Sequence, residues 1–157
     1  MIMSKRGAGI RFPPPLIFVG WGVLGWSGQR LMGLEAWTLP AAAALAVAGV
    51  LFLTGVVLVA SAIRQFREAE TPPEPWKPTT AITDRGPYAR TRNPMYLGMA
   101  CIHLAVAIGS QDTGILLGLI AAVLTIDRLV VRREEAYLLD RFGEPYSMYR
   151  ANVPRWL

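Results

Sequence analysis

The chain has 157 residues, enough for one domain, and its 53% hydrophobic content with a mean hydropathy of +0.35 excludes an ordinary soluble protein. The net charge of +5 does not indicate nucleic-acid binding, because the basic residues flank long apolar runs instead of forming a clustered basic face. The single cysteine excludes an intrachain disulfide, and the sequence has no cluster of cysteine and histidine residues that predicts a metal site.

The first apolar run predicts a helix over residues 14–34, with Arg30 near its end. A basic start before an apolar run is also typical of a signal peptide, but the small-residue cleavage pattern is missing, so we favour a retained transmembrane helix. Within the run, Gly20, Gly22 and Gly25 form G-x-G-x-x-G. Neither a strand nor a suitably placed acidic residue accompanies this motif, so we interpret the glycines as points of close helix approach and not as a dinucleotide site.

The second predicted span, residues 37–63, is the strongest, since no charge lies between Glu35 and Arg64. It is long enough to cross a hydrocarbon core of about 30 Å. Residues 64–93 are polar and rich in proline, which excludes a continuous helix. A connection of this length is normally functional or disordered, and Trp76 favours a segment that rests on the membrane surface.

Two further apolar segments, residues 94–109 and 114–131, are joined by a short polar turn and predict an antiparallel helical hairpin. The tail, residues 132–157, should continue the last helix into water. Gly143 suits the end of that helix, and Pro145 suits the start of a new short one.

The distribution of basic residues predicts the orientation in the membrane. With four helices and both termini inside, all of the 16 lysines and arginines except Arg30 lie on the cytoplasmic side. We therefore expect an all-α, polytopic membrane protein with about four transmembrane helices, a single domain over residues 1–157. The loop 64–93 and the helical tail 132–157 would share the cytoplasmic face.

Asn93 and Pro94 are favoured at the N-cap and first position of a helix, so they predict where the third helix begins. The unpaired N–H groups of that first turn, with Arg90 and Arg92 just before it, suit an anionic group such as a carboxylate. An alternative is that these arginines anchor to lipid headgroups.

A second charged cluster follows the fourth helix. Asp127, Glu134 and Arg141 recur every seven residues and are expected on one side of the helix, with Arg128 and Glu135 on another. Acidic residues this close to an apolar run suggest a site in the bundle interior. A solvated helix end with local ion pairs is the alternative.

Tyr146 and Tyr149 lie three residues apart in the tail, on one face of the predicted short helix. They could surround a ligand, pack on the bundle or anchor at the membrane interface. His103 and Cys101 do not share a helix face, and we expect each to be packed in the interior.

Together these motifs resemble the membrane methyltransferase family that includes isoprenylcysteine carboxyl methyltransferases, phosphatidylethanolamine methyltransferases and methanethiol methyltransferases. That family has R-H-P-x-Y-x-G, two adjacent glutamates after a helical hairpin, F-G-x-x-Y-x-x-Y and a final valine-proline. This chain has R-N-P-M-Y-L-G at 92–98, E-E at 134–135, F-G-E-P-Y-S-M-Y at 142–149 and V-P-R at 153–155. Asn93 stands in the histidine's place, which excludes histidine acid–base chemistry there.

The resemblance implies S-adenosylmethionine bound at the cytoplasmic ends of the last helices, with a lipid-like or small apolar acceptor reaching it from the bilayer. A lipid amine, a prenylated cysteine carboxylate and a small thiol all fit as acceptors. Arg92 and Glu135 are predicted nearest the reacting groups, and Tyr146 and Tyr149 could contact the sulfonium through their faces. The full set of residues predicted to border the cofactor is Arg92, Asn93, Pro94, Tyr96, Gly98, Glu134, Glu135, Tyr146 and Tyr149.

Two other functions are compatible with the sequence. The chain could be a non-enzymatic four-helix membrane protein whose basic face binds anionic lipid or a partner subunit. It could also be a reductase-like relative with a similar C-terminal bundle that binds a nicotinamide cofactor. Ligand binding and the effect of Arg92→Lys separate these functions from methyl transfer.

Overall fold

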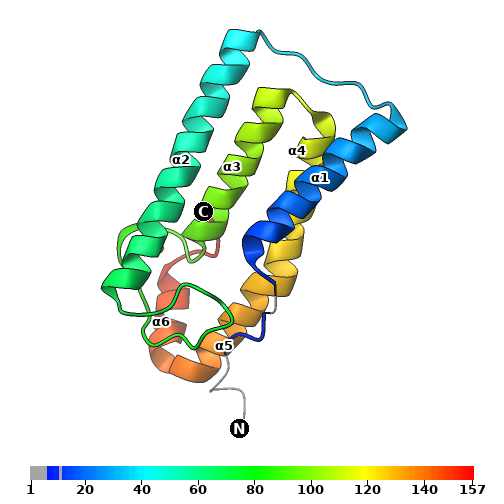
Figure 1. Cartoon of the computed structure of the whole chain (residues 1–157). Helices are drawn as coiled ribbons and strands as arrows, with labels where there is room; N and C mark the ends of the chain where they lie inside the picture. The colour runs from blue at the N-terminus through cyan, green and yellow to red at the C-terminus, as the bar shows by residue number, and fades with distance from the viewer. Residues whose placement is uncertain (1–6, 11) are drawn as a thin grey trace.

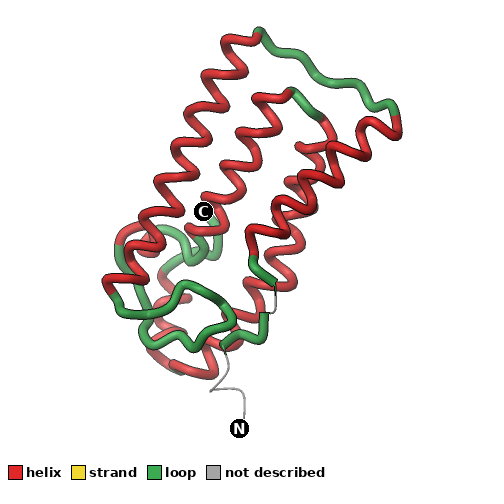
Figure 2. Tube along the Cα trace, in the orientation of Figure 1, coloured by secondary structure: helices red, strands yellow, loops and turns green. Residues whose placement is uncertain are grey.

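A computed structural model of the chain describes residues 7–10 and 12–157. These residues form helices and no strand, which confirms the all-α class (Figures 1 and 2). A 3-10 helix, η2 (Gly86–Ala89), lies in the long connection, and a π-helical segment, η3 (Asp127–Val131), lies in the last long helix. The α-helices are α1 (Pro14–Met32), α2 (Ala41–Glu68), α3 (Pro94–Ser110), α4 (Thr113–Ile126), α5 (Arg132–Phe142) and α6 (Glu144–Asn152).

Helices α1 to α4 run side by side, with α1 packed on α4 and α2 packed on α3 (Figure 1). The turn between α3 and α4 confirms the predicted hairpin. Helices α5 and α6 gather at one end of this bundle, together with the connection 69–93. The loop and the tail therefore share one end of the molecule, as the sequence predicted.

Two helices of the described chain are long and apolar enough to cross a membrane: α2, and the continuous helix Thr113–Phe142 formed by α4, η3 and α5. Helix α3 is apolar but shorter. Apolar side chains are exposed along α2, including Leu45, Val50 and Leu53, which are each more than 60% exposed. Such a surface suits lipid contact and not water. The predicted count of four spans stays a prediction.

Glycines allow the two pairs of helices to approach closely. Gly25 of α1 meets Gly114 of α4 at the main chain, which confirms the interpretation of the G-x-G-x-x-G run at that glycine. Gly98 of α3 meets Gly55 of α2, and a Cβ added at Gly98 would lie 2.8 Å from the Gly55 carbonyl oxygen. Close contact between backbones is the usual reason for small residues in packed membrane helices.

Replacing Gly98 by alanine should destabilise the fold by about 1–3 kcal/mol, because the new methyl group overpacks the α2–α3 contact. The matched control is Gly49→Ala on α2, where an added Cβ meets no atom of the described chain within 4 Å. Thermal unfolding in detergent measures both variants. Equal midpoints for the two would contradict the packing role of Gly98.

The last long helix changes its period where the apolar and charged parts meet. A regular helix returns to the same side after seven residues, but a π turn carries about one residue more. In the structure Arg155 contacts both Asp127 and Glu135, which are eight residues apart, while Glu134 contacts Tyr96. The expected grouping of Asp127 with Glu134 therefore differs from the observed one, because η3 shifts the register of every residue that follows.

The termini of α5 and α6 follow the predicted signals. Gly143 ends α5 with a positive φ of 61°, a conformation that favours glycine, and Pro145 lies in the first turn of α6. At the same end of the molecule, Ala8 donates from its main-chain N–H to the Pro75 carbonyl at 2.9 Å, and Ile10 is buried in the core. The segment 7–10 thus holds the proline-rich connection against the bundle.

Candidate active site

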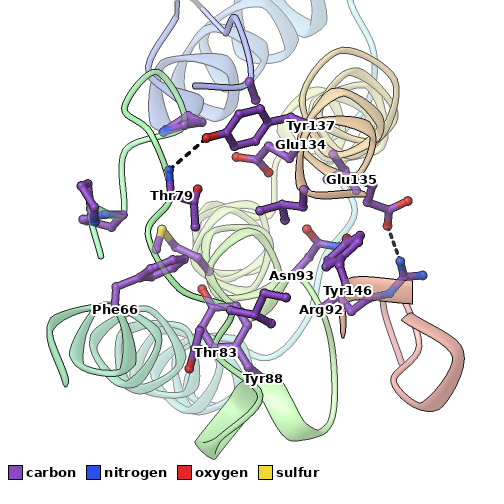
Figure 3. A pocket seen from close by; sticks show the side chains of 18 of the residues that line it. Phe66, Thr79, Thr83, Tyr88, Arg92, Asn93, Glu134, Glu135, Tyr137 and Tyr146 are labelled. Atoms are coloured by element: carbon purple, nitrogen blue, oxygen red, sulfur yellow. Dashed lines mark hydrogen bonds and ion pairs between the residues drawn. The ribbon is translucent and has the colours of Figure 1, made fainter. Parts of the chain in front are cut away.

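A cavity, partly open to solvent, lies where the connection 69–93, the start of α3, α5 and α6 meet (Figure 3). Seven of the nine residues predicted to border a cofactor line the cavity: Arg92, Asn93, Tyr96, Glu134, Glu135, Tyr146 and Tyr149. Residues from segments far apart in the sequence thus meet in one cavity.

Pro94 and Gly98, the other two predicted residues, do not line the cavity. Pro94 is fully buried at the first position of α3, where its ring begins the helix. Gly98 lies against Gly55 in the contact between α2 and α3. In this structure both residues position the helix that carries the site.

Helix α3 begins at Pro94 as predicted, but the Asn93 side chain does not cap it. Its Nδ2 instead donates to the Arg155 carbonyl at 2.9 Å, which fastens the C-terminal tail to the helix start. The first turn of a helix has N–H groups without intrahelical partners. Met95 and Tyr96, which carry such N–H groups, both line the cavity, and a helix start of this kind favours an anionic group.

Arg92 lies just before this helix start, and its side chain is only 11% exposed. Its Nη1 donates to Glu135 Oε1 at 2.8 Å (Figure 3). Its Nε is buried without a hydrogen-bond partner among the described residues. An unpaired buried donor is costly, so this atom lacks a hydrogen-bond acceptor that a bound group or a water could supply.

Glu135 is the centre of an ion-pair cluster. Arg155 holds both of its carboxylate oxygens, with Nε 2.9 Å from Oε1 and Nη2 2.6 Å from Oε2. Arg155 also donates to Asp127 at 3.2 Å, and Asp127 in turn accepts from Arg132 at 3.1 Å. Glu135 thus accepts three hydrogen bonds, two from Arg155 and one from Arg92.

Glu134 has a different environment from its neighbour. The hydroxyl of Tyr96 donates to its Oε1 at 2.8 Å. Its Oε2 makes no hydrogen bond within residues 7–10 and 12–157, and the side chain lines the cavity (Figure 3). Glu134 can therefore accept hydrogen bonds from a ligand, whereas Glu135 already accepts three from arginines.

Tyrosines form the aromatic wall of the cavity. The Tyr149 hydroxyl donates to the Tyr88 carbonyl at 2.8 Å, and the rings of Tyr146 and Tyr149 lie 6.1 Å apart. Burial raises the pKa of the Tyr88, Tyr146 and Tyr149 phenols above the ordinary value. These groups stay neutral at physiological pH and can act as hydrogen-bond donors or as ring faces toward a cation.

Several residues of the site were not predicted. Arg155 lies in the V-P-R segment 153–155, which the sequence marked as a motif but without a role. The Tyr137 hydroxyl accepts from the Thr79 N–H at 3.1 Å and holds the connection over the cavity (Figure 3). No local signal in the sequence pairs residues 58 positions apart.

Comparisons with known proteins indicate the family of this chain. The chain is 38% identical over 63 residues to an uncharacterized protein of Haemophilus influenzae. These residues make up 40% of this chain and the whole of that protein. No solved structure matches. Residues 43–145 match the sequence model of the phospholipid methyltransferase family, a region that includes Arg92, Glu134 and Glu135. This match covers well over half of the chain, so the protein belongs to the phospholipid methyltransferase family.

Proposed function

We propose that this membrane protein binds S-adenosylmethionine in the cavity and transfers its methyl group to a lipid-like or small apolar acceptor. The observation that carries the proposal is the buried, unpaired Nε of Arg92 beside the uncapped first turn of α3. Both features favour a carboxylate, and S-adenosylmethionine has one. Family membership supports the reaction class.

The remaining cavity groups also fit this cofactor. The available oxygen of Glu134 can accept from ribose hydroxyls or from the ammonium of the methionine part. The neutral tyrosines Tyr146 and Tyr149 offer ring faces to a sulfonium. Anionic, cationic and hydroxyl groups of the ligand would thus each have a partner of suitable chemistry.

When bound, the cofactor supplies an electrophilic methyl group on its sulfonium sulfur. The residues of the chain have the tasks of binding, aligning and excluding water. Arg92 holds the anionic end of the ligand, and the tyrosine wall with the connection 69–93 shields the cavity from water. Asn93 offers no titrating group, so this position supplies no acid or base to the transfer.

The site is proposed to face the cytoplasm. The loop 64–93 and the tail 132–157 that form it carry 11 of the 16 lysines and arginines, which favours the inner side of the membrane. The exposed apolar surface of α2 gives a lipid-like acceptor a route along the bilayer. A labelled methyl group recovered by mass spectrometry from membrane extracts would identify that acceptor.

Titration calorimetry on the protein in detergent tests the proposal directly. We expect S-adenosylhomocysteine to bind in the micromolar to submillimolar range, roughly −5 to −8 kcal/mol. NADH and NADPH serve as competitors, because a nicotinamide-binding relative would bind them in the same cavity. Absence of binding by S-adenosylmethionine and S-adenosylhomocysteine at millimolar concentration would contradict the function.

A further inference from the structure

Two adjacent glutamates of α5, Glu134 and Glu135, face different partners although they are neighbours in the chain. Glu134 accepts one hydrogen bond, from Tyr96, and keeps an oxygen available at the cavity. Glu135 accepts three, one from Arg92 and two from Arg155. A carboxylate that is fully engaged by two guanidinium groups has little capacity left for a ligand.

We infer that Arg155 is a positioning residue: by holding both oxygens of Glu135 it fixes the carboxylate that orients Arg92, and Glu134 alone is left to contact the ligand. The inference rests on the proposed function, because it assumes that Arg92 binds the carboxylate of S-adenosylmethionine. It assigns different roles to two glutamates that the sequence presents as a pair.

The charge balance of the cluster supports this division. Three arginines, Arg92, Arg132 and Arg155, contact two carboxylates, Asp127 and Glu135. The cluster therefore has one more positive than negative charge. Of the three arginines, Arg92 is the one that lines the cavity. Arg92 is thus the cation of this cluster that an anionic ligand group in the cavity can reach.

The geometry of Arg155 explains why it can hold Glu135 still. Its side chain forms a bidentate pair with Glu135, and its Nη1 is held from the other side by Asp127 at 3.2 Å. Bidentate guanidinium–carboxylate pairs fix direction as well as distance. Without Arg155, Glu135 would have Arg92 as its remaining guanidinium partner, and both oxygens would compete with the ligand for it.

The main chain near Arg155 has a separate, structural function. The Arg155 carbonyl accepts from Asn93 Nδ2 at 2.9 Å and from Thr91 Oγ1 at 3.1 Å, and the Pro154 carbonyl accepts from the Arg92 N–H at 3.0 Å. These bonds do not involve the Arg155 side chain. A substitution at this position therefore leaves these main-chain contacts of the tail in place.

The test compares two ligands on the full-length protein in detergent. S-adenosylhomocysteine has the amino-acid carboxylate, and 5′-methylthioadenosine lacks it. For Arg155→Gln we expect the affinity for S-adenosylhomocysteine to fall about tenfold, because the contact between Arg92 and the ligand carboxylate is weakened. The affinity for 5′-methylthioadenosine should be unchanged. Arg150→Gln, the same change at an exposed arginine of α6, should alter neither affinity.

A second comparison tests whether Arg155 acts through Glu135. In a Glu135→Gln background, Arg155→Gln should cause little further loss, because the carboxylate that Arg155 orients is gone. If Arg155→Gln does not give folded protein, Arg155→Lys carries the test. A single ammonium cannot hold both oxygens of Glu135, so we expect a smaller loss of affinity that is again confined to S-adenosylhomocysteine.

The outcomes separate the inference from the proposed function. Unchanged affinities, or equal losses for the two ligands, in Arg155→Gln would overturn the positioning role while leaving the proposed function in place. Additive losses in the Glu135→Gln background would overturn it as well. Failure of the unmodified protein to bind either ligand would overturn both.

Discussion

The Arg92→Gln variant is expected to bind S-adenosylhomocysteine about 100-fold more weakly than the unmodified protein, because it removes a buried charge and its contact with the ligand carboxylate. Arg92 is nearly buried, and Glu135 loses one of its two guanidinium partners in this variant. Calorimetry measures the binding loss, and methyl transfer at limiting cofactor should fall in parallel. Binding of 5′-methylthioadenosine should change much less, because this ligand has no carboxylate.

Arg90→Gln is the matched control for this prediction. Arg90 lies two residues away and is exposed, so its replacement should leave binding unchanged. Arg92→Lys separates the two classes of function. Lysine keeps the charge but not the planar fork, so an enzyme site should lose most of its affinity. A silent Arg92→Lys change, together with salt-sensitive lipid binding, would instead indicate a protein that binds anionic lipid.

The Glu134→Gln variant should weaken binding of S-adenosylhomocysteine about tenfold, since a hydrogen bond to a charged group contributes roughly 1.5–3 kcal/mol. The amide has nearly the same shape and can still accept from Tyr96, so the fold should be preserved. Titration calorimetry and a thermal unfolding curve in detergent provide the two measurements. A large fall in the unfolding midpoint would show a structural role instead.

Binding of 5′-methylthioadenosine also shows which group of the ligand Glu134 contacts. If this carboxylate accepts from ribose hydroxyls, 5′-methylthioadenosine should lose affinity in Glu134→Gln by a similar factor. If it accepts from the methionine ammonium, 5′-methylthioadenosine should be unaffected. Glu144→Gln, at an exposed glutamate of α6, is the control. Unchanged binding of both ligands in Glu134→Gln would contradict its contact with the ligand.

The positions of the helices could be predicted from the sequence because their signals are local. Apolar runs predicted the long helices, Pro94 predicted the start of α3, and Gly143 predicted the end of α5. The cluster of residues that line the cavity was also predicted, through motifs in the second half of the chain. The helix signals lie in a residue or its near neighbours, whereas the cavity residues were predicted through the resemblance to a family.

The roles within the cavity were decided by the tertiary structure. The π turn η3 shifts the helix register, so that Glu135 and Asp127 face Arg155 while Glu134 faces Tyr96. The register shift has no clear local signature in the sequence.

Long-range contacts decided the rest. The Asn93 side chain contacts a carbonyl 62 positions away instead of capping its own helix. The composition and local patterns of the sequence therefore determined a helical membrane protein with a charged site at one end. Which side chain meets the ligand and which supports it depended on contacts between distant segments, because those contacts set the direction in which each side chain points.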